Sequence, residues 1–479
     1  MILKGYLTGI GYGLLCLLLS LVLYKLGMPK KYTRKVVHIL VGFEWVFLYY
    51  FMGAGIHFLA VCVAFLILLA VAYKGKLMPM ISSDGDNAPG TVYYAVAMTG
   101  VAIVGCFVPE VMLPFGVGIF CTSVGDGFAG LFGQLVKSHN PRIYGKKTLI
   151  GALANLAFSF AAAMVLSAIY EMGITVWQAL AIALLATTLE LIVGRGLDNI
   201  VITWAITAFT YALMYVPGIN GYIVPILMTP IVIAFAIEKR ALTATGVAAA
   251  IGVDALISAT LGNFGFVLLM TFFGVAVIVD KVKKRAKNAG GDVEQKGDCR
   301  DHMQVIVNGL VPALAALLFW FSQNGVFLVA FVASLGEALA DTAASGAGAF
   351  AKNVYDPFRL RECKKGLSGG MSVIGTVASL VGAAIVSLVA LLFGAIDWRL
   401  MLVALLSAFL GSIFDSFLGS IFQAKYKCLA CEEIVEKREH CGRPTELFRG
   451  LALVDNDVVN LLSSLFAAGF AITLTALIL

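Results

Sequence analysis

Long apolar stretches alternate with short polar segments along the whole chain. Clear examples are residues 6–24, 149–169, 177–193 and 371–393. Each approaches the ~20 residues that a helix needs to cross a bilayer, and about sixteen such stretches can be counted. The pattern predicts an all-α integral membrane protein with about sixteen transmembrane helices.

The composition agrees with this interpretation. Hydrophobic residues make up 60% and charged residues 13% of the 479 positions, whereas soluble proteins carry roughly 25% charged residues. The chain therefore has too few polar side chains to cover a globule in water.

Positive charge is confined to one side of the predicted topology. With the N-terminus outside, all of the 34 Lys and Arg residues except Lys4 and Arg399 fall on inside loops or the adjoining helix ends. The positive-inside rule then places both termini outside the cytoplasm and the polar loops within it. The net charge of +6 favours anionic lipid heads and phosphate-bearing ligands on the inner face, not nucleic acid. The inside loops are 27–35, 74–91, 137–148, 194–198, 238–241, 281–304, 350–370 and 421–452.

The same series of motifs occurs twice. In each copy, a basic residue lies at the start of one span, and a later span rich in small residues carries carboxylates. A basic, glycine-containing hairpin follows, and an Asp-Asn pair comes two spans later. The order predicts two parallel halves that share a five-span unit, because both hairpins lie on the same side. We expect domains at 1–235 and 236–479, the second with a Cys-rich cytoplasmic insert at 424–449. The four segments are 34–38, 123–133, 145–151 and 198–199 in the first half, and 300–304, 334–348, 364–370 and 455–456 in the second.

Four carboxylates lie inside predicted spans: Asp126, Glu337, Asp341 and Asp415. Each costs roughly 2.5–3.5 kcal/mol to insert. They suit Mg²⁺ coordination, which takes one or two carboxylates plus substrate phosphates, or a catalytic base. The alternative is that each carboxylate hydrogen-bonds a neighbouring helix within glycine-mediated packing.

The hairpins and the first basic cluster could bind phosphate. Backbone N–H groups and ammonium groups suit an anion at the start of a helix. Positive-inside anchoring is the alternative for both features. The spacing from Lys147 to Gly151 equals that from Lys365 to Gly369. The hairpin lysines are Lys146, Lys147, Lys364 and Lys365, and the basic cluster is Arg34, Lys35 and His38.

The insert contains Cys428-x2-Cys431 followed by His440-Cys441. A Cys pair at this spacing followed by a second ligand pair is typical of a small zinc knuckle. Reduced, unligated thiols are the alternative. The sequence contains no Gly-x4-Gly-Lys-Ser/Thr motif, so a P-loop nucleotide site is excluded.

At these residues the first half resembles the integral membrane CTP-dependent lipid kinases, the family of phytol kinase and dolichol kinase. The resemblance covers residues 20–215. The Asp…Lys-Lys-Thr…Gly portion is shared with CTP:phosphatidate cytidylyltransferases. The matching text is Arg34-Lys35-x2-His38, Pro89-Gly90-Thr91-x-Tyr93-Tyr94, Gly125-Asp126-Gly127-x-Ala129-x3-Gly133, Lys146-Lys147-Thr148-x2-Gly151, and Glu190 with Asp198-Asn199.

The second half resembles the membrane family that includes phytyl-phosphate kinase, over residues 238–479. One position departs from the family pattern: an acidic residue is expected after Ser345, where this chain has Gly346. Glu337, one turn before Asp341, is a candidate substitute. The matching text is Gln304-Val305-x2-Asn308-Gly309, Ala340-Asp341-Thr342-x2-Ser345, Lys365-Gly366-x2-Gly369-Gly370, Gly411-x3-Asp415-Ser416-x-Leu418-Gly419-x3-Gln423 and Asp455-Asn456-Asp457-x2-Asn460.

The resemblance implies two fused kinases that use Mg²⁺ and a nucleoside triphosphate. The first would phosphorylate a long-chain isoprenoid alcohol from CTP, and the second would convert the monophosphate to the diphosphate from CTP or another nucleotide. The two sites would lie on the cytoplasmic face. A cytidylyltransferase that makes a CDP-activated lipid and a repeat-built transporter stay open as alternatives, and so does homo-oligomer formation.

The roles expected from the resemblance fall into three groups. Asp126 and Asp341 hold Mg²⁺ or orient the nucleophile, with Glu337 and Asp415 beside Asp341. His38 carries a proton. The expected nucleotide and phosphate ligands are Arg34, Lys35, Lys146, Lys147, Thr148, Gly151, Asp198, Asn199, Arg300, Gln304, Asn308, Lys364, Lys365, Gly369, Asp455, Asn456 and Asn460.

Overall fold

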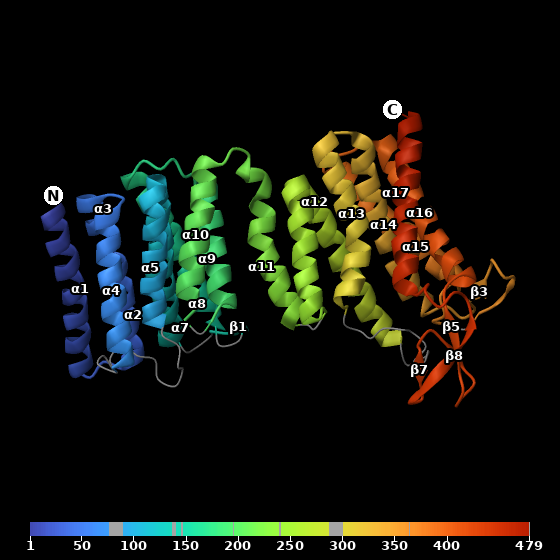
Figure 1. Cartoon of the computed structure of the whole chain (residues 1–479), viewed down its shortest axis with the longest axis horizontal. Helices are drawn as coiled ribbons and strands as arrows, with labels where there is room; N and C mark the ends of the chain where they lie inside the picture. Colours follow the sequence, from blue (N-terminus) through green and yellow to red (C-terminus); the bar gives the residue numbers. More distant parts are fainter. Residues whose placement is uncertain are drawn as a thin grey trace. The chain divides into compact units, whose positions relative to one another are not determined.

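The computed structural model describes residues 1–75, 90–136, 140–144, 147–194, 196–238, 241–286, 300–363 and 365–478. Within these residues the chain forms two compact units, Met1–Ile231 and Val232–Leu479, and each is described by itself (Figure 1). The division falls inside helix α11 (Ile223–Glu238), which also contains the boundary expected at 235/236.

Unit 1 consists of helices that run side by side, with one short β-hairpin at one end (Figure 1). A π-helical turn, η2, precedes α7, and β1 pairs with β2 in antiparallel fashion. The elements of this unit are α1 (Ile2–Lys25), α2 (Lys30–Gly42), α3 (Glu44–Met52), α4 (Ile56–Lys74), α5 (Gly90–Phe107), η1 (Pro109–Val111), α6 (Met112–Phe120), η2 (Cys121–Gly125), α7 (Asp126–Leu135), β1 (Arg142–Tyr144), β2 (Lys147–Thr148), α8 (Leu149–Ile169), α9 (Val176–Ile192), α10 (Asp198–Tyr215) and η3 (Ile219–Tyr222).

Unit 2 is a helix bundle with a small sheet at the end opposite the C-terminus (Figure 1). The sheet has the order β6-β5-β8-β7 and lies in the Cys-rich insert, while β3 and β4 form a separate hairpin. The elements are α12 (Ala244–Ala286), α13 (His302–Ser322), α14 (Gly325–Gly348), β3 (Tyr355–Asp356), β4 (Arg361–Glu362), α15 (Val373–Leu392), α16 (Trp398–Ile421), β5 (Lys425–Cys428), β6 (Ile434–Val435), β7 (Glu439–His440), β8 (Arg443–Arg449) and α17 (Asn456–Ile478).

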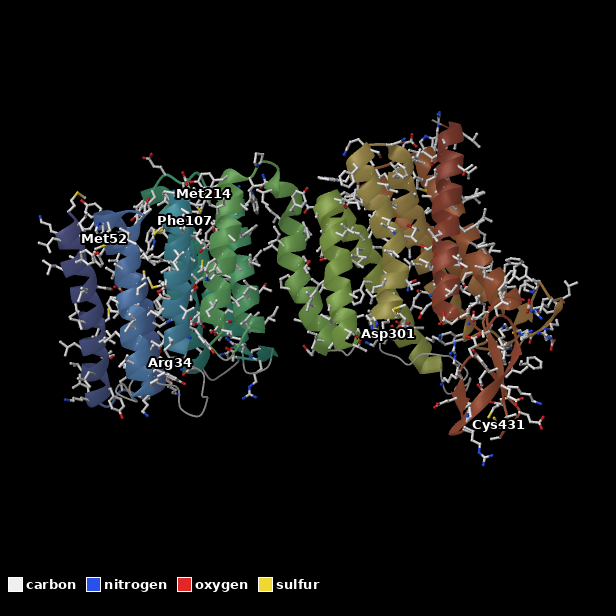
Figure 2. All side chains as sticks on the ribbon, viewed as in Figure 1. Arg34, Met52, Phe107, Met214, Asp301 and Cys431 are labelled. Atoms are coloured by element: carbon white, nitrogen blue, oxygen red, sulfur yellow. The ribbon has the colours of Figure 1, made fainter. Side chains whose placement is uncertain are left out.

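The helices confirm the prediction of an all-α integral membrane protein. Among the described residues, 13 helices are long and apolar enough to cross a membrane. The shorter helix α9 is also apolar. Helix α12 is interrupted at Gly262, whose φ of +58° is not helical. Large apolar side chains such as Phe107, 82% exposed, cover the outer helix surfaces, as lipid contact requires (Figure 2).

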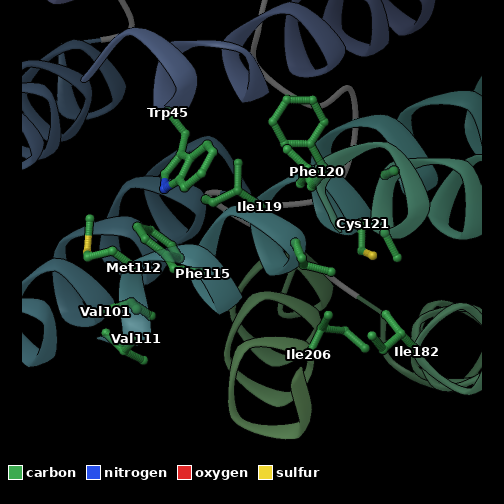
Figure 3. Packing of buried hydrophobic residues seen from close by; sticks show 14 of the residues in the cluster. Trp45, Val101, Val111, Met112, Phe115, Ile119, Phe120, Cys121, Ile182 and Ile206 are labelled. Atoms are coloured by element: carbon green, nitrogen blue, oxygen red, sulfur yellow. The ribbon is translucent and has the colours of Figure 1, made fainter. Parts of the chain in front are cut away.

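The carboxylate-bearing segments are the central helices of their units. An 18-residue stretch within 109–135 has 83% of its residues buried and one within 325–348 has 78%, whereas none of the other candidate spans among the described residues exceeds 44%. In unit 1 the surrounding core includes Trp45, whose indole lies on Gly116 of α6 (Figure 3). Asp126, Glu337 and Asp341 are therefore held by rigid packing at the middle of each unit.

The two units contain the same five-segment arrangement. The segments are α2, α6–α7, α8, α9 and α10 in unit 1, and α13, α14, α15, α16 and α17 in unit 2. In each unit the second segment packs on the first, third and fifth, the third packs on the fourth, and the fourth packs on the fifth. This order of contacts is the spatial form of the repeat that the motifs predict.

A glycine at one helix crossing fixes the register of the repeat. A Cβ on Gly151 of α8 would lie 3.0 Å from the carbonyl oxygen of Ala129, and one on Gly375 of α15 would lie 3.2 Å from that of Ala344. The same backbone-to-backbone approach therefore occurs at both places. Three residues earlier on the central helices, the corresponding carboxylates are Asp126 and Asp341.

The helix caps confirm this register and correct one expected correspondence. Thr148 accepts a hydrogen bond from the Gly151 amide at 3.3 Å, and Ser372 accepts one from the Gly375 amide at 3.1 Å. The match of Gly151 with Gly369 is therefore wrong. Gly369 has a φ of +86°, and a Cβ at this position would collide with the backbone of Ser420. Both its conformation and the lack of space therefore require glycine.

A third pair of contacts aligns the fourth segments. In unit 1 Thr187 of α9 donates to Asn155 Oδ1 of α8 at 3.2 Å. In unit 2 Ser379 of α15 donates to Ser412 of α16 at 2.9 Å, at the equivalent place. Three residues further along, the corresponding carboxylates are Glu190 and Asp415.

We expect Gly382→Ala to destabilise unit 2. A Cβ at this position of α15 would lie 2.9 Å from the Leu339 carbonyl oxygen of α14, and backbone atoms cannot yield as a flexible side chain can. Overpacking of this kind costs about 1–3 kcal/mol. Gly469→Ala is the matched control, because a Cβ there meets nothing within 4 Å. Thermal unfolding in detergent checks both variants, and an equally stable Gly382→Ala protein would contradict the close packing of α14 on α15.

Candidate active sites

In unit 1 Asp126 lies where three helices and the π-helical turn meet. Its side chain is 8% exposed. Lys35 Nζ of α2 lies 2.7 Å from Asp126 Oδ2 and donates to the Asp126 carbonyl oxygen at 3.2 Å. The stem of Lys35 passes over Gly130, where any side chain would collide with it. The glycine in this helix therefore provides the space that the lysine occupies.

His38 lies one turn further along α2, beside the same carboxylate. Its Nε2 is 3.0 Å from the Thr122 carbonyl oxygen and 3.7 Å from Asp126 Oδ2. Because a carbonyl oxygen only accepts, Nε2 carries the hydrogen in this contact and Nδ1 is the basic nitrogen of the neutral ring. Arg34 is exposed and lies at the opposite end of unit 1 from Met52 (Figure 2). It interacts electrostatically with His38.

A second ion pair lies next to the first. Lys147 of β2 forms a hydrogen-bonded ion pair with Glu190 of α9 and also interacts electrostatically with Asp126 and Asp198. Burial acts to lower the pKa of Lys147, but the Glu190 and Asp126 carboxylates outweigh it and hold that pKa above its ordinary value. Lys147 is therefore a fixed positive charge, only 31% exposed, among three carboxylates.

The other expected ligands of unit 1 have structural contacts. Thr148 and Gly151 form the N-terminal cap of α8. Asn199 donates to the Gly90 carbonyl oxygen at 2.9 Å and so ties α10 to the start of α5. Lys146 lies outside the described residues.

In unit 2 three carboxylates come together from two helices. Glu337 and Asp341 lie one turn apart on α14, and Asp415 on α16 interacts electrostatically with both. Glu337 is 2% and Asp415 9% exposed. Ser463 of α17 donates to Asp415 Oδ2 at 3.2 Å, and the Asn460 amide, oriented to suit both of its neighbours, donates to the same oxygen at 3.2 Å. The structure therefore assembles four of the expected residues into one cluster.

A lysine that the motifs did not indicate faces this cluster. Lys283 of α12 donates to Ser345 at 3.1 Å and interacts electrostatically with Asp341. In the register of the repeat Ser345 corresponds to Gly130, over which Lys35 lies. Lys283 thus occupies in unit 2 the place that Lys35 occupies in unit 1, although it comes from a different helix.

The departure at Gly346 has a packing reason. Any side chain at this position would collide with Val279 of α12. Gly346 therefore allows α12 to approach α14, and the same helix carries Lys283 to the carboxylates. Glu337, the candidate substitute for the missing acidic residue, lies in the cluster.

Three further expected ligands of unit 2 make structural contacts. Arg300 pairs with Asp280 at 2.9 Å. Gln304 forms a capping box with Asp301 at the start of α13. Asn308 donates to the Gln304 carbonyl oxygen at 3.0 Å. None of these three contacts involves the carboxylate cluster.

The last group includes residues at the polar end of unit 2. Asp455 accepts hydrogen bonds from two amides in the first turn of α17, and Asn456 begins that helix. Lys365 lies in the turn before α15, and Lys364 lies outside the described residues.

Comparison with known proteins assigns the second half to a family. The model of the integral membrane protein family DUF92 matches residues 227–468, half of the chain. The chain belongs to the DUF92 family. No solved structure matches the chain.

Three curated relatives are similar over part of the chain. An uncharacterized membrane protein of Synechocystis is 28% identical over 200 residues, 41% of this chain and 78% of the relative. A Methanocaldococcus jannaschii membrane protein is 32% identical over 157 residues, 31% of this chain and 61% of the relative. Protein VTE6, chloroplastic, of Arabidopsis thaliana is 26% identical over 212 residues, 43% of this chain and 62% of the relative.

The DUF92 match includes the whole carboxylate cluster together with α12, which carries Lys283. The sequence signal for Lys283 is weak, because it lies in a run of basic residues at the end of a span. Unit 1 contains a clearer signal. Glu44 interrupts the apolar run between α2 and α3, is 3% exposed, and its Oε1 has no hydrogen-bond partner among the described residues.

The carboxylates of the two clusters are chemically suited to a divalent cation. In unit 1 Asp126 interacts electrostatically with both Glu190 and Asp198. In the DUF92 unit Glu337, Asp341 and Asp415 all interact with one another. Such clusters require compensating positive charge. Lysines provide part of that charge in unit 1, and Lys283 provides part of it in the DUF92 unit. Carboxylate oxygens are the protein ligands that Mg²⁺ prefers, and it takes only one or two of them beside phosphate oxygens.

Proposed function

We propose that this chain is a membrane phosphotransferase with two sites that act in sequence on an isoprenoid lipid. Unit 1 transfers a phosphoryl group from CTP to a long-chain isoprenoid alcohol. The DUF92 unit transfers a second one, from CTP or another nucleoside triphosphate, to the monophosphate. The observation that carries the proposal is the repeated constellation. Corresponding carboxylates interact in each unit, Asp126 with Glu190 and Asp341 with Asp415, and a lysine contacts the same position of the central helix.

In unit 1 the reaction begins at the lipid hydroxyl. Its oxygen forms a bond to the γ-phosphorus of CTP, the bond from that phosphorus to the β–γ bridging oxygen breaks, and CDP leaves. The hydroxyl proton passes to Nδ1 of His38. Lys35 and Lys147 bind phosphate oxygens, and Asp126 with Asp198 would hold Mg²⁺. When bound, Mg²⁺ neutralises charge on the β- and γ-phosphates.

In the DUF92 unit the nucleophile is a phosphate oxygen, which is already ionised at neutral pH. The reaction there needs positioning and charge compensation instead of a proton acceptor. Lys283 binds the monophosphate, and Asp341 with Asp415 would hold Mg²⁺. Glu337 and Ser463 orient these carboxylates from the buried side.

Fusion of the two units has a physical advantage. A monophosphate with a long isoprenoid chain stays in the bilayer, where burial of each CH₂ group contributes about 0.8 kcal/mol. The product of the first site therefore reaches the second by lateral diffusion, without leaving the membrane.

The test is an assay of the purified chain in lipid with γ-labelled CTP, Mg²⁺ and geranylgeraniol. We expect label first in the monophosphate and then in the diphosphate, with CDP released. Pyrophosphate release from phosphatidate, with no labelled isoprenoid, would reject the proposal in favour of a cytidylyltransferase. Labelled monophosphate alone, also after other nucleoside triphosphates are supplied, would reject the second activity.

Lys283→Met should weaken binding of the monophosphate. Removal of one phosphate-binding ammonium group costs about 1.5–3 kcal/mol, so we expect the KM for supplied geranylgeranyl monophosphate to rise by about tenfold or more. Alcohol phosphorylation by unit 1 should not change. Lys281→Met, two residues away and exposed, is the matched control, and equal KM values in the two variants would show that Lys283 serves only as a membrane anchor.

A further inference from the structure

Four metal-binding side chains converge in the insert of the DUF92 unit. One ligand atom from each of Cys428, Cys431, His440 and Cys441 lies within 4.8 Å of all the others. They come from two separate turns, one between β5 and β6 and the other between β7 and β8. The label of Cys431 in Figure 2 marks this end of the sheet.

The distances among Cys431, His440 and Cys441 match the edges of a coordination tetrahedron. Cys431 Sγ and Cys441 Sγ are 3.8 Å apart, and each lies 3.4 Å from His440 Nδ1. With Zn–S bonds of ~2.3 Å and Zn–N bonds of ~2.0–2.1 Å, tetrahedral geometry requires ~3.8 Å between sulfurs and ~3.5 Å between sulfur and nitrogen. A disulfide would instead need sulfurs at ~2.05 Å.

The backbone of both turns is shaped to present these ligands. The Ala430 amide lies 3.4 Å from Cys428 Sγ and points at it, as an amide does toward a thiolate ligand. Glu432, just after the first pair, has a φ of +60°, and Cys441 has a φ of +53°. Non-glycine residues with positive φ are uncommon and persist where the surroundings hold them.

The sheet has little else to hold it together. Its buried apolar cluster consists of Ala424, Tyr426 and Val435, and two of its four strands have two residues each. A small sheet with so small a core normally needs a metal or disulfide to fold stably.

The same sheet holds the loop that precedes α15. Glu436, 6% exposed, accepts hydrogen bonds from the Ser368 amide at 2.7 Å, the Ser368 hydroxyl at 3.0 Å and the Gln423 amide at 3.0 Å. Lys425, fully buried, donates to the Ser368 carbonyl oxygen. Loop 365–371 is therefore held against the insert by hydrogen bonds to both the backbone N–H and the backbone carbonyl of Ser368.

We propose that Cys428, Cys431, His440 and Cys441 bind one structural Zn²⁺ ion, which fixes the insert so that Glu436 and Lys425 hold loop 365–371 in place. Three thiolates and one imidazole form a closed ligand set, typical of structural zinc. The inference does not depend on the phosphotransferase function, because it concerns only the metal and the backbone of the loop.

The first measurement is the metal content of the full-length protein purified without chelators. We expect about one zinc ion per chain, released when 4-hydroxymercuribenzoate blocks the thiols. Cys431→Ser and Cys441→Ser should lose it, while Cys106→Ser, in α5 and outside the cluster, should keep it. Wild-type protein with less than about one zinc in five chains, or with iron in its place, would overturn the proposal.

The second measurement is hydrogen exchange of loop 365–371 in the wild-type chain, which avoids any folding defect of a variant. Release of zinc should speed exchange of these amides by about tenfold or more, because local opening becomes easier. Glu436→Gln should speed the same amides while zinc stays bound. Unchanged exchange after complete zinc release would show that the metal does not hold the loop.

Discussion

Asp126→Asn should lower isoprenoid alcohol phosphorylation by at least about 100-fold, a loss of the size seen when one preorganised electrostatic group is removed from an active site. The substitution keeps the size of the side chain and one hydrogen-bonding oxygen. It removes the charge that pairs with Lys35 at 2.7 Å and that would bind Mg²⁺. Turnover of supplied geranylgeranyl monophosphate should stay at the wild-type rate, because the proposed site for that reaction lies in the DUF92 unit.

Asp341→Asn should give the reciprocal result, with normal alcohol phosphorylation and loss of the diphosphate. Both rates are measured on the same preparation with γ-labelled nucleotide, so a folding defect would lower both together. Asp397→Asn is the matched control, since Asp397 caps α16 and Asn caps a helix equally well. Loss of both activities in either active-site variant, with the fold intact, would mean that the two clusters do not act as separate sites.

Lys147→Met should destabilise unit 1 by about 2–3 kcal/mol, and Lys147→Met with Glu190→Leu should recover most of that loss. The single variant leaves the Glu190 carboxylate, 5% exposed, buried without its partner, which costs ~3–5 kcal/mol for a fully buried pair. The expected loss of stability is smaller here because Lys147 is 31% exposed. Replacement of both charges by apolar groups removes the unpaired charge.

Activity should not recover with stability. The double variant lacks the ammonium group that we propose binds phosphate, so alcohol phosphorylation should stay near zero while the unfolding temperature returns toward that of the wild type. Thermal unfolding in detergent and the alcohol assay, run in parallel, separate the two effects. Recovery of activity in the double variant would mean that Lys147 and Glu190 form a structural pair only.

The sequence predicted the helical membrane fold and the repeat well, because both depend on features that survive without tertiary detail. Apolar runs reveal spans, and the carboxylates of Asp126 and Asp341 are conspicuous inside them. The exact register was less accessible. The register depends on close contacts of Gly151 and Gly375 with the backbone of the neighbouring helix. The sequence alone favours Gly369 in place of Gly375, because Gly369 has the same spacing from a lysine as Gly151.

The candidate sites were predictable where a residue is costly in its surroundings and not where it is common there. A carboxylate within a span is expensive, so the sequence singles out Asp126, Asp341 and Asp415 as candidates. A lysine at the end of a span is ordinary, so the sequence does not distinguish Lys283 from its neighbours. The contacts of Glu436 with Ser368 could not be foreseen, because they join positions 68 residues apart.

The position of Lys283 on α12 limits how far the DUF92 unit can be shortened from its N-terminal side. In unit 1 the lysine over the central helix belongs to the first segment of the repeat, so those five segments carry their own cation. In the DUF92 unit the equivalent charge comes from α12, which precedes the repeat. A fragment that starts at α13 would retain every repeated segment and its carboxylates but no lysine over them, so the smallest fragment worth expressing begins before α12.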